Sequence, residues 1–125
     1  MAKKILIIED ESLLSMALEV KLSNAGFEVK TVPNAMEATN ELENDSYDLI
    51  LMDVVVPQVD GFALLKELGQ KKTKTPVIIV SNLREESDIE RAKKLGAKDY
   101  FIKSRMSLSE IVERTRKFFE KSDKK

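Results

Sequence analysis

Short runs of apolar residues recur along the chain, with longer stretches of helical spacing between them. The clearest runs are too short for helices and are rich in aliphatic side chains: Ile5–Ile8, Leu49–Met52 and Val77–Val80. Continuous apolar runs of this length are typical of parallel strands that are buried on both faces of a sheet. The pattern therefore predicts a buried parallel sheet.

Two weaker segments alternate apolar and polar residues, as half-buried strands do. Glu28–Val32 follows Gly26 and Asp99–Ile102 follows Gly96, and each glycine stands where a preceding helix would end. With the apolar runs these segments make five strands, separated by stretches that predict five helices. Such alternation predicts an α/β fold with a doubly wound sheet.

Two of the predicted helices begin with a capping-box spacing, in which a side chain caps the helix and an acidic residue follows three positions later. Asn34 precedes Glu37 in this way, and Ser107 precedes Glu110. The first helix, predicted at about 11–24, is apolar over a wider surface than one core-facing stripe requires. Two interpretations stay open for it: all of its apolar side chains pack in the core, or part of its surface docks a partner helix.

The composition fits one domain. The chain has 125 residues, of which 42% are hydrophobic and 34% charged, and it contains no cysteine and no histidine. We expect a single domain over 1–125, with a core at about 3–119 and a polar tail at 120–125. The missing residue types exclude thiolate metal sites, serine–histidine triads and a phosphohistidine of its own. Any chemistry must use carboxylates, hydroxyls and lysines.

The charge pattern limits the partners. With 21 basic and 22 acidic residues the net charge is −1, so we expect no direct binding to nucleic acid. The amino-terminal apolar run stops at Glu9 and Asp10, which is too short for a signal peptide. No apolar run approaches the roughly 20 residues that span a bilayer, so we expect a cytoplasmic protein without membrane insertion.

Polar residues follow four of the five predicted strands at one edge of the sheet, where ligands bind in doubly wound folds. They are Glu9, Asp10, Asp53, Ser81 and Lys103. Clustered carboxylates repel one another unless a cation neutralises them, and oxygen ligands alone favour Mg²⁺. A carboxylate nucleophile beside Mg²⁺ and a lysine suits phosphoryl transfer. Because no Gly-rich phosphate loop is present, a phosphorylated partner is expected to supply the group.

These residues closely resemble the receiver domain of two-component response regulators, from about Lys3 to Phe119. The likeness rests on four features, which are the pair Glu9-Asp10, the segment Asp53-Val-Val-Val-Pro57-Gln-Val-Asp60-Gly61, Ser81 after its apolar run, and Gly96-Ala-Lys-Asp-Tyr100-Phe-Ile-Lys103. It implies a flavodoxin-like fold with sheet order 2-1-3-4-5. It also implies that the chain is not a dedicated enzyme, although it catalyses its own Mg²⁺-dependent phosphorylation and dephosphorylation.

The resemblance assigns a role to each of these positions. Asp53 would be the phospho-acceptor, Glu9 and Asp10 would hold Mg²⁺ directly or through water, and the carbonyl of Val55 would complete the metal site. Ser81 would bind the phosphoryl group, Lys103 would pair with it, and Tyr100 would be the ring that swings inward as Ser81 moves. That ring would couple the site to the fourth-helix face. The other interpretation of Tyr100 is an ordinary tyrosine at the edge of the core.

The sequence departs from the family pattern at two positions beside this site. Asn82 stands where the family usually has a small residue, and its larger side chain would crowd the phosphoryl site. Ser104 replaces a proline that commonly follows a cis bond, and a non-proline cis bond costs about 3–4 kcal/mol. We therefore expect a trans bond there and an altered position of Lys103. Val55 and Leu83, which flank the path of attacking water in this family, are both apolar, which predicts a long-lived aspartyl phosphate.

The resemblance implies a sensor histidine kinase or a histidine phosphotransfer protein as phosphoryl donor and an unnamed downstream protein as target. One alternative is an interaction module with this fold that has lost phosphorylation, and another is a metal-dependent phosphohydrolase of similar topology. The latter usually carries a second aspartate two residues after the first, where this chain has Val55. We expect a single-domain regulator, although a receiver cut from a longer protein stays open.

Overall fold

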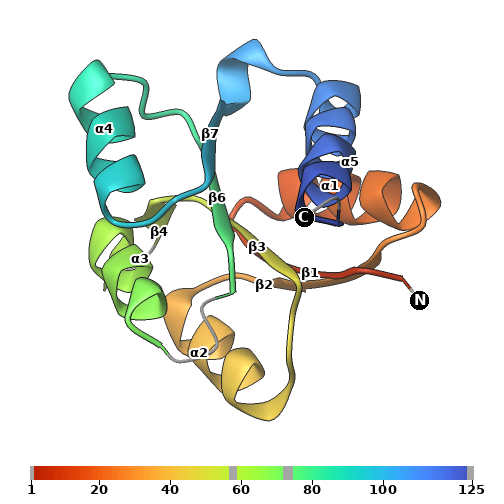
Figure 1. Ribbon diagram of the computed structural model, residues 1–125, viewed down its shortest axis with the longest axis horizontal. Helices are drawn as coiled ribbons and strands as arrows, with labels where there is room; N and C mark the ends of the chain where they lie inside the picture. Colours follow the sequence, from red (N-terminus) through yellow and green to blue (C-terminus); the bar gives the residue numbers. More distant parts are fainter. Residues whose placement is uncertain (1, 57–58, 72–74, 124–125) are drawn as a thin grey trace.

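The computed structural model describes residues 2–56, 59–71 and 75–123, and its centre is a five-stranded sheet with helices on both faces (Figure 1). The sheet strands are β1 (Lys4–Ile8), β2 (Glu28–Val32), β3 (Leu49–Met52), β6 (Val77–Ser81) and β7 (Asp99–Ile102). All neighbouring strands are parallel, in the order β2-β1-β3-β6-β7. Counted along the chain, this is the predicted order 2-1-3-4-5, so the fold prediction is confirmed.

The helices form two layers (Figure 1). One layer holds α1 (Ser12–Asn24) and α5 (Leu108–Asp123), and the other holds α2 (Ala35–Asn44), α3 (Gly61–Gly69) and α4 (Glu86–Lys94). Successive strand residues point to opposite faces of the sheet. Each buried strand therefore contributes side chains to two hydrophobic cores, one on each face. In β1, Ile5 and Ile7 pack toward Leu18 of α1, whereas Leu6 and Ile8 pack with the second layer. This double burial explains the continuous apolar runs.

Both predicted helix starts are capped, but only the cap at Ser107 is a reciprocal capping box, because the Glu37 side chain accepts from the Asn34 side-chain amide and not from its backbone N–H. Asn34 Oδ1 accepts a hydrogen bond from the Glu37 backbone N–H at 2.9 Å, at the start of α2. At the start of α5, the Ser107 and Glu110 side chains each accept from the other residue's backbone N–H, at 3.1 and 3.2 Å. Each cap satisfies at least one N–H group that a helix terminus leaves unpaired.

A small antiparallel hairpin between β3 and α3 was not predicted. Its strands are β4 (Val55–Val56) and β5 (Val59–Asp60). Pro57 and Gln58, which belong to the motif that follows Asp53, lie outside the described residues. The hairpin carries the chain from the end of β3 to the start of α3.

A close backbone contact explains the glycine that begins α3. The Gly61 N–H donates to the Val54 carbonyl at 3.1 Å, and a Cβ at residue 61 would lie 2.1 Å from the same oxygen. A side chain therefore cannot be added without moving one of the two backbone segments. Asp60 fixes the same turn, because its Oδ1 accepts from the Phe62 N–H at 2.9 Å.

The apolar surface of α1 is only partly buried. Leu18 and Leu22 are in the core, but Leu13, Met16 and Val20 are 79%, 64% and 58% exposed. The interpretation that all apolar residues of α1 pack in the core is therefore wrong for these three. They share one helix face, since they are spaced by three and four residues.

Two substitutions in α1 should distinguish its faces. We expect Leu18→Ala to lower the free energy of unfolding by about 2–5 kcal/mol, because it leaves a cavity beside the sheet. Leu13→Ala should change it by less than about 0.5 kcal/mol, because that side chain is exposed. Urea unfolding followed by circular dichroism measures both, and equal losses would contradict the assignment of the two faces.

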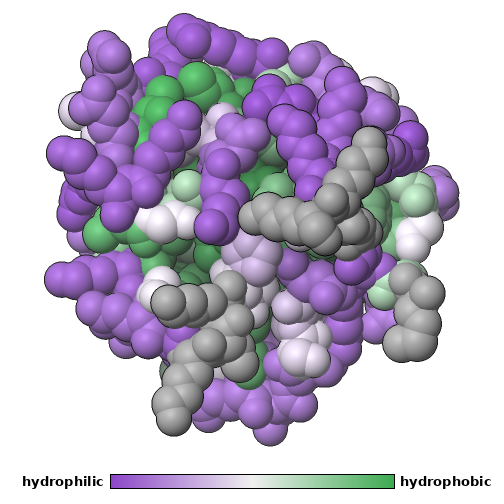
Figure 2. All heavy atoms as spheres, viewed as in Figure 1, coloured by the Kyte–Doolittle hydropathy of each residue, from purple (hydrophilic) through white to green (hydrophobic). Residues whose placement is uncertain are grey.

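The two edges of the sheet carry charged residues. On β2 the side chains of Glu28 and Lys30 are exposed. On β7 the Asp99 carboxylate accepts from Arg114 of α5 at 2.9 Å. On the face drawn in Figure 2, hydrophilic side chains cover most of the surface and hydrophobic atoms show mainly in hollows between them.

The carboxyl-terminal helix extends into the predicted polar tail. α5 continues to Asp123, and only Lys124 and Lys125 of that tail lie outside the described residues. The helix is anchored by Phe119, which is buried with its ring centroid 5.5 Å from that of Phe27. In the part of the chain that the structure describes, no helix is long and apolar enough to cross a membrane.

Candidate functional site

The strand register brings the predicted site residues to the carboxyl edge of the sheet. Ile8 of β1 pairs with Met52 of β3, and the Asp53 N–H donates to the Ile8 carbonyl at 3.1 Å, so Glu9 and Asp53 follow neighbouring strands. The sheet order reverses between these strands, which is where doubly wound sheets bind ligands. The register of β6 with β7 ends at Ser81 and Ile102, one residue before Lys103.

Lys103 bridges the two buried carboxylates. Its Nζ lies 2.6 Å from Glu9 Oε1 and 2.6 Å from Asp53 Oδ2, and the carboxylate residues are only 5% and 6% exposed. The other oxygen of each carboxylate accepts a hydrogen bond from the backbone N–H of the residue two positions later in the chain. Glu9 Oε2 accepts from Glu11 at 3.1 Å, and Asp53 Oδ1 accepts from Val55 at 2.9 Å. Both carboxylates are therefore fixed and aimed at one cation.

Burial and charge oppose each other in this group. Burial raises the pKa of Glu9 above its usual value, although the hydrogen bond from Lys103 offsets part of the rise. Burial by itself would lower the pKa of Lys103, but hydrogen bonds to Asp53 and Glu9 outweigh it and raise the pKa. Lys103 therefore stays charged and compensates the buried carboxylates.

Ser81 and Tyr100 meet through the backbone of Leu83. Ser81 is fully buried and its Oγ accepts from the Leu83 N–H at 3.3 Å, while the Tyr100 hydroxyl donates to the Leu83 carbonyl at 2.5 Å. Tyr100 is 9% exposed, and burial raises the pKa of its hydroxyl, which keeps it protonated as a donor. The ring thus lies inside the fold, linked to the loop that follows Ser81.

Asp10 and Val55 lie at the rim of the group. The Asp10 side chain is exposed and lines, with Glu9, a depression of about 100 Å³ between the loops that follow β1 and β2. The side chain of Val55 is also exposed, while its amide is bound to Asp53. Of the predicted residues, the structure brings Glu9, Asp53 and Lys103 into direct contact.

The donor set fits a hard cation. Among the described residues no three acidic groups lie close enough together to enclose a metal ion by themselves. Glu9 and Asp53 nevertheless converge on one positive charge, the Lys103 ammonium. Mg²⁺ needs only one or two carboxylates, because water and phosphate oxygens complete its octahedron. The residues are thus compatible with Mg²⁺.

Asn82 and Ser104, the two residues that differ from the family pattern, contact each other. The described residues include no cis peptide bond, so the bond before Ser104 is trans as expected. The Ser104 N–H donates to Asn82 Oδ1 at 2.9 Å, and Lys103 still reaches Asp53. Sequence reasoning noted both residues but missed their contact. The available signal was that a non-proline residue at 104 restores a backbone donor.

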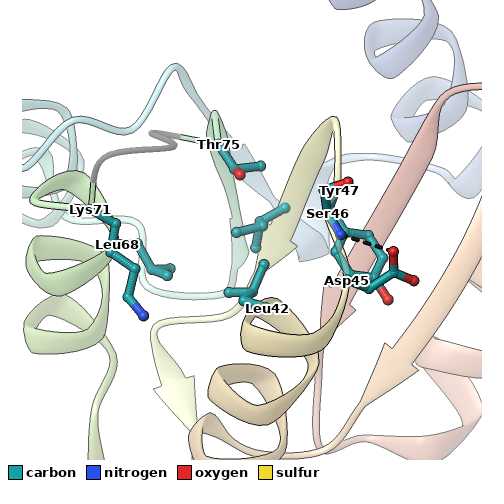
Figure 3. A pocket seen from close by; sticks show the side chains of 8 residues that line it. Leu42, Asp45, Ser46, Tyr47, Leu68, Lys71 and Thr75 are labelled. Atoms are coloured by element: carbon teal, nitrogen blue, oxygen red, sulfur yellow. Dashed lines mark hydrogen bonds between the residues drawn. The ribbon is translucent and has the colours of Figure 1, made fainter.

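A separate pocket lies at the opposite end of the sheet, between α2 and α3 (Figure 3). It measures about 70 Å³ and is bordered by residues that precede β3 and β6, such as Tyr47 and Thr75. Asp45 and Lys71 lie on opposite sides of it, and Leu42 and Leu68 contribute apolar walls. No predicted site residue borders it.

Comparison with known proteins gives consistent matches. The family described as "Response regulator receiver domain" matches residues 5–116. The alkaline phosphatase synthesis transcriptional regulatory protein PhoP of Bacillus subtilis is 36% identical over 82% of this chain and 43% of its own length. The transcriptional regulatory protein CrdR of Helicobacter pylori is 35% identical over 95% of this chain and 56% of its own length. The chain thus spans about half the length of these curated relatives.

A solved structure is similar over nearly the whole chain. The phosphorylated cyanobacterial phytochrome response regulator RcpA is 31% identical, covers 96% of this chain with 93% of its own, and superposes with a TM-score of 0.80.

Proposed function

The chain belongs to the response regulator receiver domain family of two-component signalling, and from this premise we propose that Asp53 accepts a phosphoryl group in a Mg²⁺-dependent reaction. The observation that carries the proposal is the Lys103 bridge to Asp53 and Glu9, at 2.6 Å each. A lysine held at a buried carboxylate is placed to meet the charge of a phosphoryl group added there. The phosphorylated state of RcpA, a relative of similar structure, is further support.

The donor in this proposal is a phosphohistidine of a sensor histidine kinase or a histidine phosphotransfer protein. An Asp53 carboxylate oxygen forms the new P–O bond, and the P–N bond to the imidazole breaks. The leaving nitrogen keeps the electron pair and takes a proton. Asp53 is held in place for this reaction, because Lys103 binds one of its oxygens and the Val55 N–H binds the other.

The neighbouring side chains assist this transfer. Lys103 moves its ion pair from Asp53 to the phosphoryl oxygens, and the Ser81 hydroxyl donates a hydrogen bond to one of them. Glu9, Asp10, Asp53 and the Val55 carbonyl would hold Mg²⁺, which when bound neutralises negative charge on the phosphoryl oxygens. Tyr100, already linked to the loop after Ser81, is the side chain proposed to convey the change to a downstream protein.

The direct test uses acetyl phosphate, which needs no partner protein. We expect a Mg²⁺-dependent mass increase of one phosphoryl group in the wild type and none in Asp53→Asn. Asp48→Asn is a matched control, because Asp48 is an exposed aspartate just before β3 and its carboxylate binds the Lys4 backbone. Intact-mass spectrometry measures the mass increase in all three proteins.

The outcome decides between a phosphorylated receiver and an interaction module that has lost phosphorylation. If the wild type and Asp48→Asn incorporate a phosphoryl group and Asp53→Asn does not, phosphorylation of Asp53 is supported. Without incorporation in any protein, the chain is a phosphorylation-independent interaction module. Incorporation that survives Asp53→Asn would place the acceptor elsewhere.

The apolar residues beside the site predict a slow loss of the phosphoryl group. Val55 and Leu83 provide no hydrogen-bonding side chain to orient an attacking water. We expect the aspartyl phosphate to persist for much longer than seconds in Mg²⁺, and Val55→Asn to shorten its lifetime. Mass spectrometry over time after removal of the donor measures it, and decay within seconds in the wild type would contradict the prediction.

A further inference from the structure

The backbone segments that follow Ser81 and Lys103 are joined by one side chain. The ladder of β6 with β7 has its last pair at Ser81 and Ile102. Beyond it, the Asn82 carboxamide oxygen accepts from the Ser104 N–H at 2.9 Å. The side chain of Asn82 thus adds one more link between the two strands, at the point where the backbone ladder has stopped.

This link lies next to both groups that are proposed to contact the phosphoryl group. Ser81 precedes Asn82, and Lys103 precedes Ser104. After Ile102 the chain turns at once into a short 3-10 helix (Lys103–Arg105), so strand pairing no longer holds its direction. The Ser104 N–H is the point at which this turn is tied back to β6.

We propose that Asn82 is a positioning residue for phosphoryl transfer, because its hydrogen bond to the Ser104 N–H holds the turn that aims Lys103 at Asp53. The proposal rests on the proposed function, since it concerns the same site. A proline at 104 would remove the donor, and a small side chain at 82 would remove the acceptor. The two departures from the family pattern therefore work only as a pair.

We expect the hydrogen bond between Asn82 and Ser104 also to keep the Asn82 side chain from crowding the phosphoryl site. That side chain is exposed and its oxygen is bound to the turn after β7. Without this hydrogen bond, the exposed asparagine side chain would sample several rotamers. The hydrogen bond selects one of them.

A double-mutant cycle tests the pair. The rate of Mg²⁺-dependent phosphorylation by acetyl phosphate is measured for the wild type, Asn82→Ala, Ser104→Pro and the double variant. We expect each single variant to react about three- to tenfold more slowly, the range that loss of one modest hydrogen bond produces. The double variant should be no slower than the slower single variant, because both changes remove the same bond.

Ser104→Ala is the matched control, since it keeps the backbone N–H and removes only the hydroxyl. We expect it to react at the wild-type rate. A loss in Ser104→Ala as large as in Ser104→Pro, or single effects that multiply in the double variant, would overturn the proposal. Unfolding in urea is measured for every variant, and a rate loss matched by a loss of folded protein at the assay temperature would also overturn it.

A spectroscopic readout separates this proposal from the proposed function. The side-chain ¹⁵N–¹H resonance of Lys103 reports how firmly its ammonium is held, whether or not phosphorylation occurs. We expect this resonance to broaden or shift in Asn82→Ala and to stay unchanged in Ser104→Ala. If the wild type takes up no phosphoryl group, the proposed function fails. An unchanged Lys103 resonance in Asn82→Ala would overturn the positioning role, whether or not phosphorylation occurs.

Discussion

Gly61→Ala should destabilise the fold by about 3 kcal/mol or more, at the upper end of what overpacking usually costs. The added Cβ would lie 2.1 Å from the Val54 carbonyl oxygen, which is backbone and has no rotamer to change. The hydrogen bond from Gly61 to the same oxygen would be lost as the segments separate. Because Val54 follows Asp53, we also expect slower phosphorylation in the fraction that stays folded.

Gly69→Ala provides the matched control in the same helix. Its Cβ would lie 3.2 Å from the Leu95 carbonyl oxygen, which requires a displacement of only a few tenths of an ångström. We expect a change in the free energy of unfolding of less than about 1 kcal/mol. Since the chain has no tryptophan, urea unfolding is followed by far-ultraviolet circular dichroism. Similar losses in both variants would show that the contact with Val54 is not the cause.

Lys103→Met should lower the free energy of unfolding at neutral pH by about 3–5 kcal/mol and greatly slow phosphorylation. The substitution keeps the apolar volume but leaves Glu9 and Asp53 buried without their common counter-charge. Lys98→Met is the control, because Lys98 is an exposed lysine just before β7 and should be replaceable without cost. Equal stability of the two variants would mean that the bridge contributes nothing to folding.

The loss in Lys103→Met should depend on pH in a defined direction. Burial raises the pKa of Glu9, and removing Lys103 takes away the interaction that offsets this rise. For a group whose pKa is raised in the folded state, stability is fully present below the ordinary pKa and is lost as the pH rises through the raised value. The destabilisation of Lys103→Met should therefore shrink as the pH falls toward 4.5, the ordinary value for glutamate. Urea unfolding at several pH values measures this trend.

The arrangement of the central sheet was predictable because its strands and several helix starts carry local signals. The buried strands at 5–8, 49–52 and 77–80 are continuous apolar runs, and the structure extends two of them by one residue. Asn34 and Ser107 mark helix starts through contacts that span only three residues. Strand ends then bring Glu9, Asp53 and Lys103 together, because parallel strands share one carboxyl edge.

The remaining features depend on contacts between distant segments. Asn82 and Ser104 are 22 residues apart. The serine at 104 indicates a backbone donor, but nothing in the local sequence indicates that Asn82 is its acceptor. The apolar residues of α1 point in several directions, so spacing could not show that Leu13 would be exposed while Leu18 would be buried. The β4–β5 hairpin has strands of two residues each, too short for any periodicity.

The charged sheet edges have a consequence for self-association. An edge strand exposes unpaired backbone groups and can recruit a strand from another molecule, which leads to aggregation. Glu28 and Lys30 are exposed on β2, and charged side chains on an edge strand disfavour pairing with a second copy. At the other edge, Arg114 reaches from α5 to Asp99 of β7. These charges disfavour growth of the sheet at either edge. We therefore expect a solution kept concentrated for structural work to resist fibril formation.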